Sequence, residues 1–167
     1  TGFKVNSGEY KLMGLAPYGD PTARIPRSNR TYISLLEEMI VETGDYDYQI
    51  DQRWVSYYRE QNKWVSDEFI DLMGPKRDHN TDLSAHHMNL AAALQMRLET
   101  VVLNQLKRAR KEFSIDRLAM AGGVALNCSM NGKIETSGLF EEIFVQPGSG
   151  DDGTAIGGCY LAHKAIH

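Results

Sequence analysis

The spacing of the apolar residues changes near residue 114 of the chain. Before that point, from Ser84 to Phe113, apolar residues recur with a period of about 3.6, which predicts one long amphipathic helix. The apolar stripe consists of Leu90, Leu94, Leu98, Val101 and Leu106. The small side chains of the stretch LAAAL favour close packing of this helix against a neighbouring element.

After residue 114, short apolar runs alternate with helical patterns. The runs DRLAMAG and EEIFVQP predict two buried strands, and a stretch with helical periodicity follows each of them. In the first of these helices, Leu126, Met130 and Ile134 form an apolar face; the second helix is rich in Gly and Ala, which suit tight helix packing. Strand, helix, strand and helix with short connections predict parallel strands with right-handed crossovers. The predicted fold class is therefore α/β.

The N-terminal half has less regular patterns. The stretch Gly8–Pro21 predicts one or two helical turns that stop at APYGDP, a cluster of loop-forming residues. Arg30–Thr43 predicts a helix, with Gly44 as its C-cap. From residue 46 the aromatic-rich sequence alternates in part and allows strands, and a further helix is expected to begin after the N-cap Ser66 and to end before Pro75.

Length and composition fit one globular domain, with 167 residues, 42% of them hydrophobic and 24% charged. Within this single α/β domain we expect residues 30–113 to form a mostly helical insertion and residues 114–167 to form a strand–helix–strand–helix unit. The chain begins at Thr1, in what reads as mid-domain sequence, so we expect it to be a fragment of a longer protein.

Charge and cysteine content limit the classes of function. A net charge of -4 argues against a nucleic-acid partner, which favours a basic face, and no apolar run approaches the roughly 20 residues that cross a membrane. Cys128 and Cys159 do not form a disulfide framework or a metal-binding pair, which favours a reduced, cytoplasmic setting. Because Cys128 falls among apolar residues of a predicted helix, we expect a buried, inert thiol.

Both predicted strands run into glycine-rich turns, and parallel sheets bind ligands at the carboxyl ends of their strands. Gly122 and Gly123 in AMAGGVALN let a backbone approach an anionic or flat ligand, and the helix that follows offers unpaired N–H groups to phosphate. Asn127, one turn into that helix, is placed to hydrogen-bond a ribose or base. The alternative, which the turn alone leaves open, is a tight joint without a ligand.

The second turn, GSGDDGTAIGG, carries two carboxylates at the start of a helix. One of Asp151 and Asp152 suffices to cap the helix, and a metal with a phosphate favours an oxygen ligand at this place. A capping Asp beside a solvated Asp is the alternative. His86 and His87, near the start of the long helix, favour a surface or cap role over a metal-ligand role, and we assign none of the five histidines to a metal site.

Three stretches together, EYKLMGLAPYG, AGGVALNCSMNGKI and FVQPGSGDDGTAIGG, resemble signature sequences of the nodulation-type O-carbamoyltransferases, a family that includes antibiotic-tailoring enzymes. The resemblance implies the second half of an N-terminal, ATP-binding domain with the actin/Hsp70/sugar-kinase-like (ribonuclease H-like) fold. It implies transfer of a carbamoyl group from carbamoyl phosphate, via carbamoyl-adenylate, to the hydroxyl of a small acceptor such as a sugar or natural product. The first half-domain and an adenylate-forming domain are then the missing partners, and the isolated fragment is expected to be inactive.

The resemblance also assigns roles to residues. The nucleotide-binding segment of the family matches Gly122, Gly123 and Asn127. Asp151 matches a metal-binding aspartate, with iron as the metal of the best-known type, and Asp152 is its polar neighbour. Glu9 and Lys11 lie in the stretch that borders the nucleotide or acyl-donor pocket. The paired metal histidines of the family belong to the early half of the domain.

Two other functions stay open at this point. One is half of a sugar-kinase-like or ATPase domain, and the other is a non-enzymatic nucleotide-binding or structural module. The Tyr- and Trp-rich stretch from residue 45 to residue 82 either packs in the core, the interpretation we favour, or shapes a pocket for the acceptor, because flat aromatic rings suit sugar faces.

Overall fold

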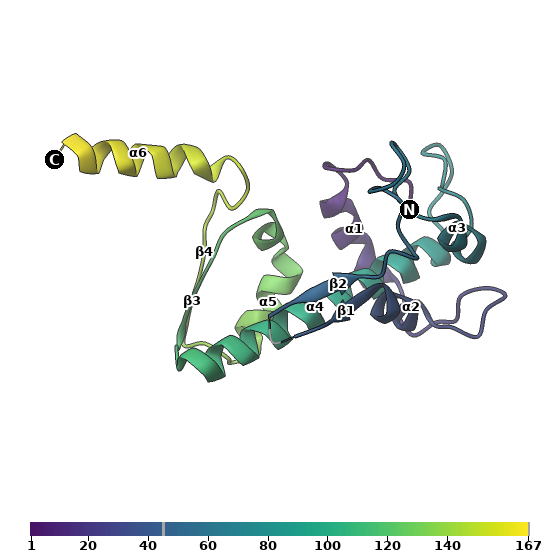
Figure 1. Ribbon diagram of the computed structural model, residues 1–167, viewed down its shortest axis with the longest axis horizontal. Coiled ribbons are helices and arrows are strands. Elements are labelled where there is room, and N and C mark those ends of the chain that lie inside the picture. Colours follow the sequence, from purple (N-terminus) through teal and green to yellow (C-terminus); the bar gives the residue numbers. More distant parts are fainter. Residues whose placement is uncertain (45, 167) are drawn as a thin grey trace. The chain divides into compact units, whose positions relative to one another are not determined.

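The computed structural model describes residues 1–44 and 46–166, and the chain forms two compact units, Thr1–Gln105 and Leu106–His167 (Figure 1). The chain is α/β, with a short parallel sheet in the second unit. The elements of the first unit are α1 (Glu9–Leu15), η1 (Ala16–Tyr18), α2 (Tyr32–Met39), β1 (Ile40–Glu42), β2 (Tyr48–Ile50), α3 (Asp67–Met73) and most of α4 (Ala85–Phe113). The second unit contains β3 (Arg117–Met120), η2 (Gly123–Leu126), α5 (Cys128–Thr136), β4 (Glu142–Val145) and α6 (Gly153–Ile166).

The long helix predicted from the apolar stripe is confirmed as α4, and its alanines are the points of closest packing. Ala91 packs against Leu15 and Ala16 of the APYGD region. Ala93 belongs to the larger core of the first unit, whose other buried members are Ile25, Tyr32, Leu35, Leu36, Trp54 and Met73. The prediction of α3 is also confirmed, since the Ser66 hydroxyl accepts a hydrogen bond from the Phe69 N–H at 3.1 Å. No helix in the described part of the chain has the length and apolar character that a bilayer crossing requires.

The helix predicted over Arg30–Thr43 is shorter than expected. It begins at a capping box between Thr31 and Ser34 and ends at Met39, after which Ile40–Glu42 pairs antiparallel with Tyr48–Ile50. Ile and Val favour strands because their branched side chains fit a pleated surface, and a pairing partner was close in sequence. Gly44 is therefore not a helix C-cap, and the strand expected after residue 46 is confirmed as β2.

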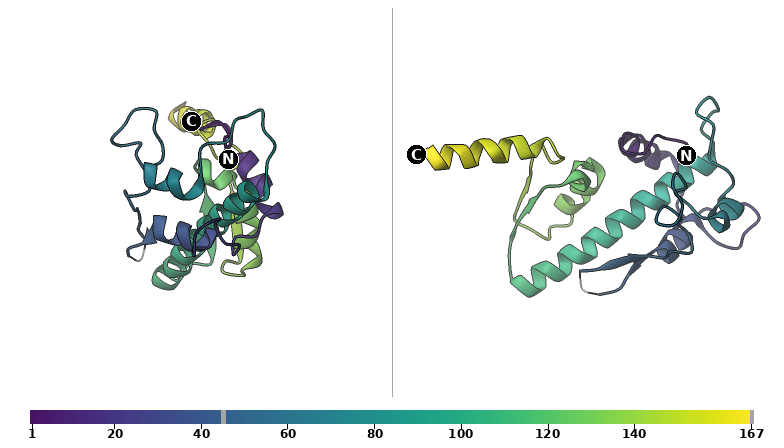
Figure 2. Two further views of the ribbon diagram at one scale, coloured as in Figure 1. Left: turned by 90° about the vertical axis from the view of Figure 1, so that its right-hand side faces the viewer. Right: turned by 45° about the horizontal axis from the view of Figure 1, so that its top comes forward.

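The β1–β2 hairpin lies along α4 (Figures 1 and 2). A largely buried charge pair joins the two. The guanidinium of Arg97 lies 3.3 Å from the Glu42 carboxylate, and its Nε donates to the carbonyl of Ile40 at 3.0 Å. The Asn104 amide donates to both oxygens of the same carboxylate at 3.2 Å. These bonds satisfy the charges that the interface buries and fix which side of the hairpin faces the helix.

His86 joins α4 to α2 and α3. Its Nδ1 lies 2.7 Å from the hydroxyl of the buried Tyr32, and a backbone hydrogen bond links its ring to Met73. Burial lowers the pKa of His86 and raises the pKa of Tyr32, which favours a neutral ring whose Nδ1 accepts a hydrogen bond from the tyrosine hydroxyl. His87 lies beside it and bonds to Ser84 at the start of α4, so both histidines have structural partners.

This arrangement predicts a loss of stability in mild acid. A histidine whose pKa is lowered by folding stabilises the native state above its unfolded pKa of about 6.5, and this stabilisation is lost as the pH falls below that value. We expect the melting temperature of the wild-type protein to drop between about pH 7 and pH 5. The His86→Gln variant, which cannot titrate there, should show a flatter profile, although His87 also has a lowered pKa and keeps part of the slope. An equal slope in both proteins would contradict the assignment.

The second unit confirms the predicted parallel strands. β3 and β4 pair in register from Arg117↔Glu142 to Met120↔Val145. The prediction that both strands are buried is wrong, because only two strands pair among the described residues and every position of both strands is at least partly exposed. α5 buries Met130 and Ile134 as expected.

Two packing predictions for the second unit are corrected. Leu126, expected on the apolar face of α5, lies in η2 and is exposed. None of the residues Gly153–Ile166 is buried, so the tight packing predicted for the Gly- and Ala-rich α6 is not seen in the described residues.

Candidate functional site

The two glycine-rich turns lie next to each other at the carboxyl ends of β3 and β4. The Gln146 N–H donates to the carbonyl of Met120 at 3.0 Å, which extends the strand pairing by one residue. The Gly122 N–H then donates to the carbonyl of Ser149 at 2.7 Å and joins the first turn to the second. Ser149 is buried, and its hydroxyl donates to the carbonyl of Gln146 in the same turn. The turns thus form one hydrogen-bonded backbone surface.

Glycine is required at the start of the first turn. Gly122 has φ 96° and ψ 158°, a region that is essentially restricted to glycine. Its neighbour Gly123 opens η2 and has no heavy atom near the position of an added Cβ, so the space beside the backbone is open. The N–H groups of Gly123 and Val124 precede the first η2 bond, which runs from the Ala125 N–H to the carbonyl of Gly122 at 2.9 Å. This backbone can approach a ligand closely.

Asn127 lies at a different place in the helix than the sequence predicted. The expected single helix over VALNCSMNGKIETS is interrupted, and Asn127 is the residue between η2 and α5. Its side-chain oxygen caps α5 by accepting from the Met130 N–H at 2.9 Å. The reason is that Asn competes well for a free helix N–H, which favours a new helix start over continuation. Its predicted role toward a ribose or base is not tested by this geometry.

Asn131, a residue the sequence analysis missed, supports the same turn. Its amide nitrogen donates to the carbonyl of Ala125 at 2.8 Å and holds η2 onto α5. Its side-chain oxygen is buried and has no hydrogen-bond partner in residues 1–44 and 46–166. The signal available in the sequence was the spacing to Asn127, which places the two residues one helical turn apart.

Asp151 and Asp152 precede α6, and both are exposed. At the start of α6 the hydrogen bonds are accepted by main-chain carbonyls and not by the carboxylates. The carbonyl of Asp151 accepts one from the Thr154 N–H at 3.2 Å and one from the Thr154 hydroxyl at 2.6 Å. Neither carboxylate has a hydrogen-bond partner in the part of the chain that the structure describes. The capping alternative is therefore wrong, and both carboxylates are available to a ligand.

The Asp152 carboxylate lies over its own turn. Its two oxygens are 3.2 and 3.3 Å from the positions of an added Cβ on Gly150 and Gly148. The α6 helix starts against the carbonyl of Gly148, which an added Cβ on Gly153 would strike, so this glycine sets the helix close to the turn. Both carboxylates of the pair stay exposed.

Glu9 and Lys11 belong to the first unit, whereas the two glycine-rich turns belong to the second. The Glu9 carboxylate folds back on the start of α1, where it accepts from the N–H groups of Asn6 at 2.8 Å and Gly8 at 3.0 Å. Hydrogen bonds from its own N–H and from that of Asn6 lower the pKa of Glu9. Lys11 is exposed, with its ammonium 5.8 Å from the centre of the Tyr10 ring. Their predicted role near a nucleotide remains a prediction.

Asp151 and Asp152 can supply only part of the ligand set that a divalent metal needs. Asp151 and Asp152 supply hard oxygen donors, but within residues 1–44 and 46–166 no three His, Cys, Asp or Glu side chains group as a metal site. His163 and His167 have the H-x-x-x-H spacing, which the interpretation of the five histidines overlooked, and His167 lies outside the described residues.

The cysteine prediction is corrected by the position of α5. Cys128 and Cys159 are both exposed. Cys128 is the first residue of α5, and the buried face of that helix carries Met130 and Ile134 instead. Apolar neighbours in sequence did not bury this thiol, because burial on a helix follows the face and not the local composition.

Comparison with known proteins places the sequence of this chain in one family. The family model for the carbamoyltransferase N-terminus matches residues 1–160. An uncharacterised protein of Synechocystis sp. is 39% identical over 159 residues, which are 94% of this chain and 24% of that protein. Nodulation protein NolO of Bradyrhizobium diazoefficiens is 35% identical over 158 residues, 95% of this chain and 25% of that protein.

A further relative is nodulation protein NolNO of Sinorhizobium fredii, which is 35% identical over 158 residues. The match covers 95% of this chain and 20% of NolNO. The chain therefore spans between 20% and 25% of the length of these relatives.

Proposed function

Because this chain belongs to the carbamoyltransferase N-terminal family, we propose that it is part of an ATP-dependent carbamoyltransferase. In this proposal the protein moves a carbamoyl group from carbamoyl phosphate, through carbamoyl-adenylate, to the hydroxyl of a small acceptor. The observation that carries the proposal is the hydrogen bond from Gly122 to Ser149, which joins two glycine-rich turns at the carboxyl ends of parallel strands. That edge is where α/β sheets bind nucleotides.

The residues of this edge take distinct roles in the proposed reaction. The exposed backbone at Gly122 and Gly123 receives the adenosine side of the nucleotide, because no side chain separates it from a ligand. Asp151 is the metal ligand, with Asp152 as its polar neighbour, and Asn127 binds the nucleotide. A bound divalent metal would supply positive charge against the phosphate groups. The chain orients the adenylate so that its carbonyl carbon meets the acceptor hydroxyl.

We further propose that the chain belongs to a domain with the actin/Hsp70/sugar-kinase-like fold, and the short parallel sheet with adjoining helices supports this. The same sheet is compatible with a kinase or an ATPase. The two exposed carboxylates beside the turns favour an enzyme with a metal-bound phosphate over a purely structural module.

The released phosphates distinguish the candidate functions. Incubated with ATP, magnesium or ferrous iron and carbamoyl phosphate, the full-length protein is expected to release pyrophosphate only when carbamoyl phosphate is present. Water first releases inorganic phosphate from carbamoyl phosphate and leaves carbamate, whose oxygen attacks the α-phosphorus of ATP and displaces pyrophosphate. AMP then leaves when the acceptor hydroxyl attacks the carbamoyl carbon of the adenylate. Phosphorus NMR measures these products. Formation of ADP independent of carbamoyl phosphate would support a kinase or an ATPase instead. The absence of any product would contradict the proposal that the protein is an enzyme of this kind.

A further inference from the structure

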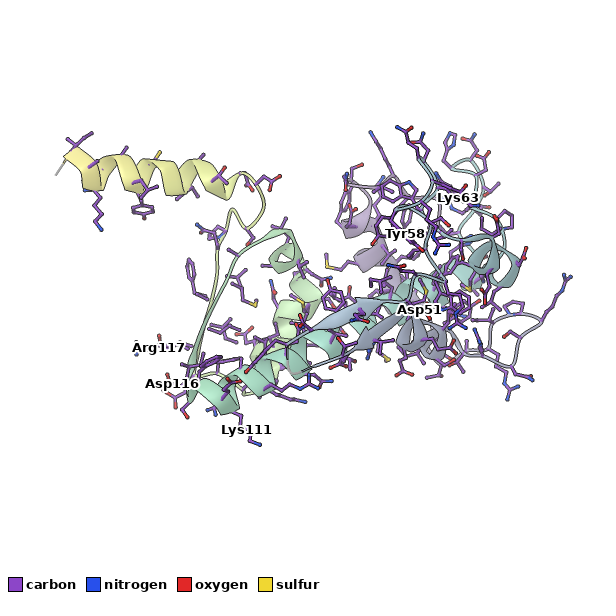
Figure 3. The ribbon with its side chains drawn as sticks, viewed as in Figure 1. Asp51, Tyr58, Lys63, Lys111, Asp116 and Arg117 are labelled. Atoms are coloured by element: carbon purple, nitrogen blue, oxygen red, sulfur yellow. The ribbon has the colours of Figure 1, made fainter. Side chains whose placement is uncertain are left out.

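A groove of about 820 Å³ runs along the β1–β2 hairpin of the first unit. This volume lies within the range of about 300–1,000 Å³ that small-molecule sites occupy. Its lining residues are Val41, Thr43, Gln49, Ile50, Asp51, Gln52, Val55, Tyr57 and Tyr58. Asp51 and Tyr58 are labelled in Figure 3.

The hairpin presents its polar face to the groove. Side chains alternate across a strand, and the register pairs Val41 with Gln49. Glu42, one position on, faces Arg97 of α4 at 3.3 Å, so Val41 and Thr43 face the opposite way. The side chains of Thr43 and Gln49 make no hydrogen bond with other residues of the described chain. The groove wall thus carries a hydroxyl and an amide that are free to bind a ligand.

Two tyrosines form the other wall, and the chain around them holds them in place. Trp54 and Ser56 are buried, and they alternate with Val55 and Tyr57, which line the groove. The Tyr58 hydroxyl donates to the carbonyl of Gln52 at 3.2 Å.

The Tyr57 ring is the open one of the two. Tyr58 has the guanidinium of Arg59 5.0 Å from its ring centre. Tyr57 is 56% exposed and meets Tyr58 edge to face, with ring centres 5.9 Å apart. The Tyr58 ring is therefore held in place, and the more exposed Tyr57 ring lines the groove.

The chemistry of this lining selects against charged ligands. No Lys or Arg lies among the described lining residues, which disfavours a phosphate, and the single carboxylate, Asp51, already pairs with Arg53 at 3.0 Å. What is left is an aromatic face, short apolar side chains, a hydroxyl and amides. A pyranose ring matches this set, because its C–H face covers an aromatic ring while its hydroxyls exchange hydrogen bonds with hydroxyl, amide and carboxylate groups.

We propose that the β1–β2 groove binds the pyranose ring of a sugar, with Tyr57 under the ring and Thr43, Gln49 and Asp51 bonded to its hydroxyls. That this sugar is the acceptor of the carbamoyl group rests on the proposed function. The aromatic stretch then has both of the roles that the sequence left open, since Trp54 lies in the core and Tyr57 lines the groove.

Saturation-transfer NMR of the full-length protein with cellotriose tests this assignment. We expect saturation of the ring protons and a Kd of about 1 mM, and no comparable signal from sorbitol, a polyol without a ring. The Tyr57→Ala variant should weaken binding about tenfold, and Tyr57→Phe, which keeps the ring, should retain it. The matched control is Tyr48→Ala: Tyr48 is 54% exposed on the same hairpin but does not line the groove.

The possible results separate this inference from the proposed function. Absence of cellotriose binding, equal binding of sorbitol, or equal losses in Tyr57→Ala and Tyr48→Ala would overturn the groove assignment. A protein that releases pyrophosphate from ATP with carbamoyl phosphate but binds no sugar contradicts the groove alone. A protein that binds cellotriose but forms no adenylate product contradicts the proposed reaction and leaves the groove in place.

Discussion

The Asp151→Ala variant of the full-length protein is expected to lose carbamoyl transfer by about a hundredfold or more. Replacing residues that only support metal ligands costs about 10- to 100-fold, so removal of a ligand itself should reach at least the upper end. The structural basis is that the Asp151 carboxylate is exposed, has no partner in the described residues and lies in a turn that is hydrogen-bonded to the Gly122 turn. Turnover and bound metal per protein are the two measurements.

Two further variants separate the metal role from a general effect of charge. Asp151→Asn keeps the size of the side chain and removes its charge, so it should lose metal and turnover nearly as far as Asp151→Ala does. Glu135→Ala removes an exposed carboxylate of α5 in the same unit and should behave as wild type. If Asp151→Ala retained wild-type turnover and metal content, the assignment of Asp151 as the metal ligand would be wrong.

The Gly122→Ala variant is expected to destabilise the two turns by about 1–3 kcal/mol. A Cβ at φ 96° and ψ 158° is strained whatever space surrounds it, and relaxing the backbone would weaken the bond from the Gly122 N–H to the Ser149 carbonyl. Because the chain forms two compact units, which need not unfold in one step, amide hydrogen exchange over residues 117–153 is the suitable measurement. Faster exchange confined to this segment is the expected result.

The neighbouring glycine provides the matched control. Gly123 lacks a left-handed φ and has no heavy atom within 4 Å of an added Cβ. Gly123→Ala should therefore leave exchange unchanged or slow it, because alanine restricts the unfolded chain more than glycine does. Equal acceleration in both variants would show that loss of a glycine as such, and not the conformation at Gly122, matters for the turns.

Periodic patterns predicted the elements that depend on local sequence. The helix α4 and the Ser66 cap of α3 were confirmed because spacing and capping residues act over one or two turns, although of the five stripe residues only Val101 is fully buried. The pairing of β3 with β4 was confirmed because a strand, a helix and a second strand with short joints allow few other arrangements.

The predictions that were wrong have other causes. Ile40–Glu42 left the predicted helix because it found a partner strand at Tyr48–Ile50, and a residue window that ends before the partner cannot detect this pairing. Leu126 was assigned to the apolar face of α5 from its spacing, but the helix breaks at Asn127, so Leu126 lies in η2 and is exposed. Cys128 was expected to be buried because of its apolar neighbours, but it lies two residues before the buried Met130 and therefore on another face of α5.

The sequence by itself determined the α/β class, the order of strands and helices after residue 114, the positions of both glycine-rich turns and the resemblance that family membership confirmed. Only the tertiary structure decided that Gly122 bonds to Ser149 and that the carboxylates of Asp151 and Asp152 do not cap α6. It also decided that Tyr57 lines a groove while Trp54 is buried. Local patterns follow from the preferences of neighbouring residues. The burial of Trp54 and the bond from Gly122 to Ser149 depend on residues that lie far away in the sequence, which local patterns do not specify.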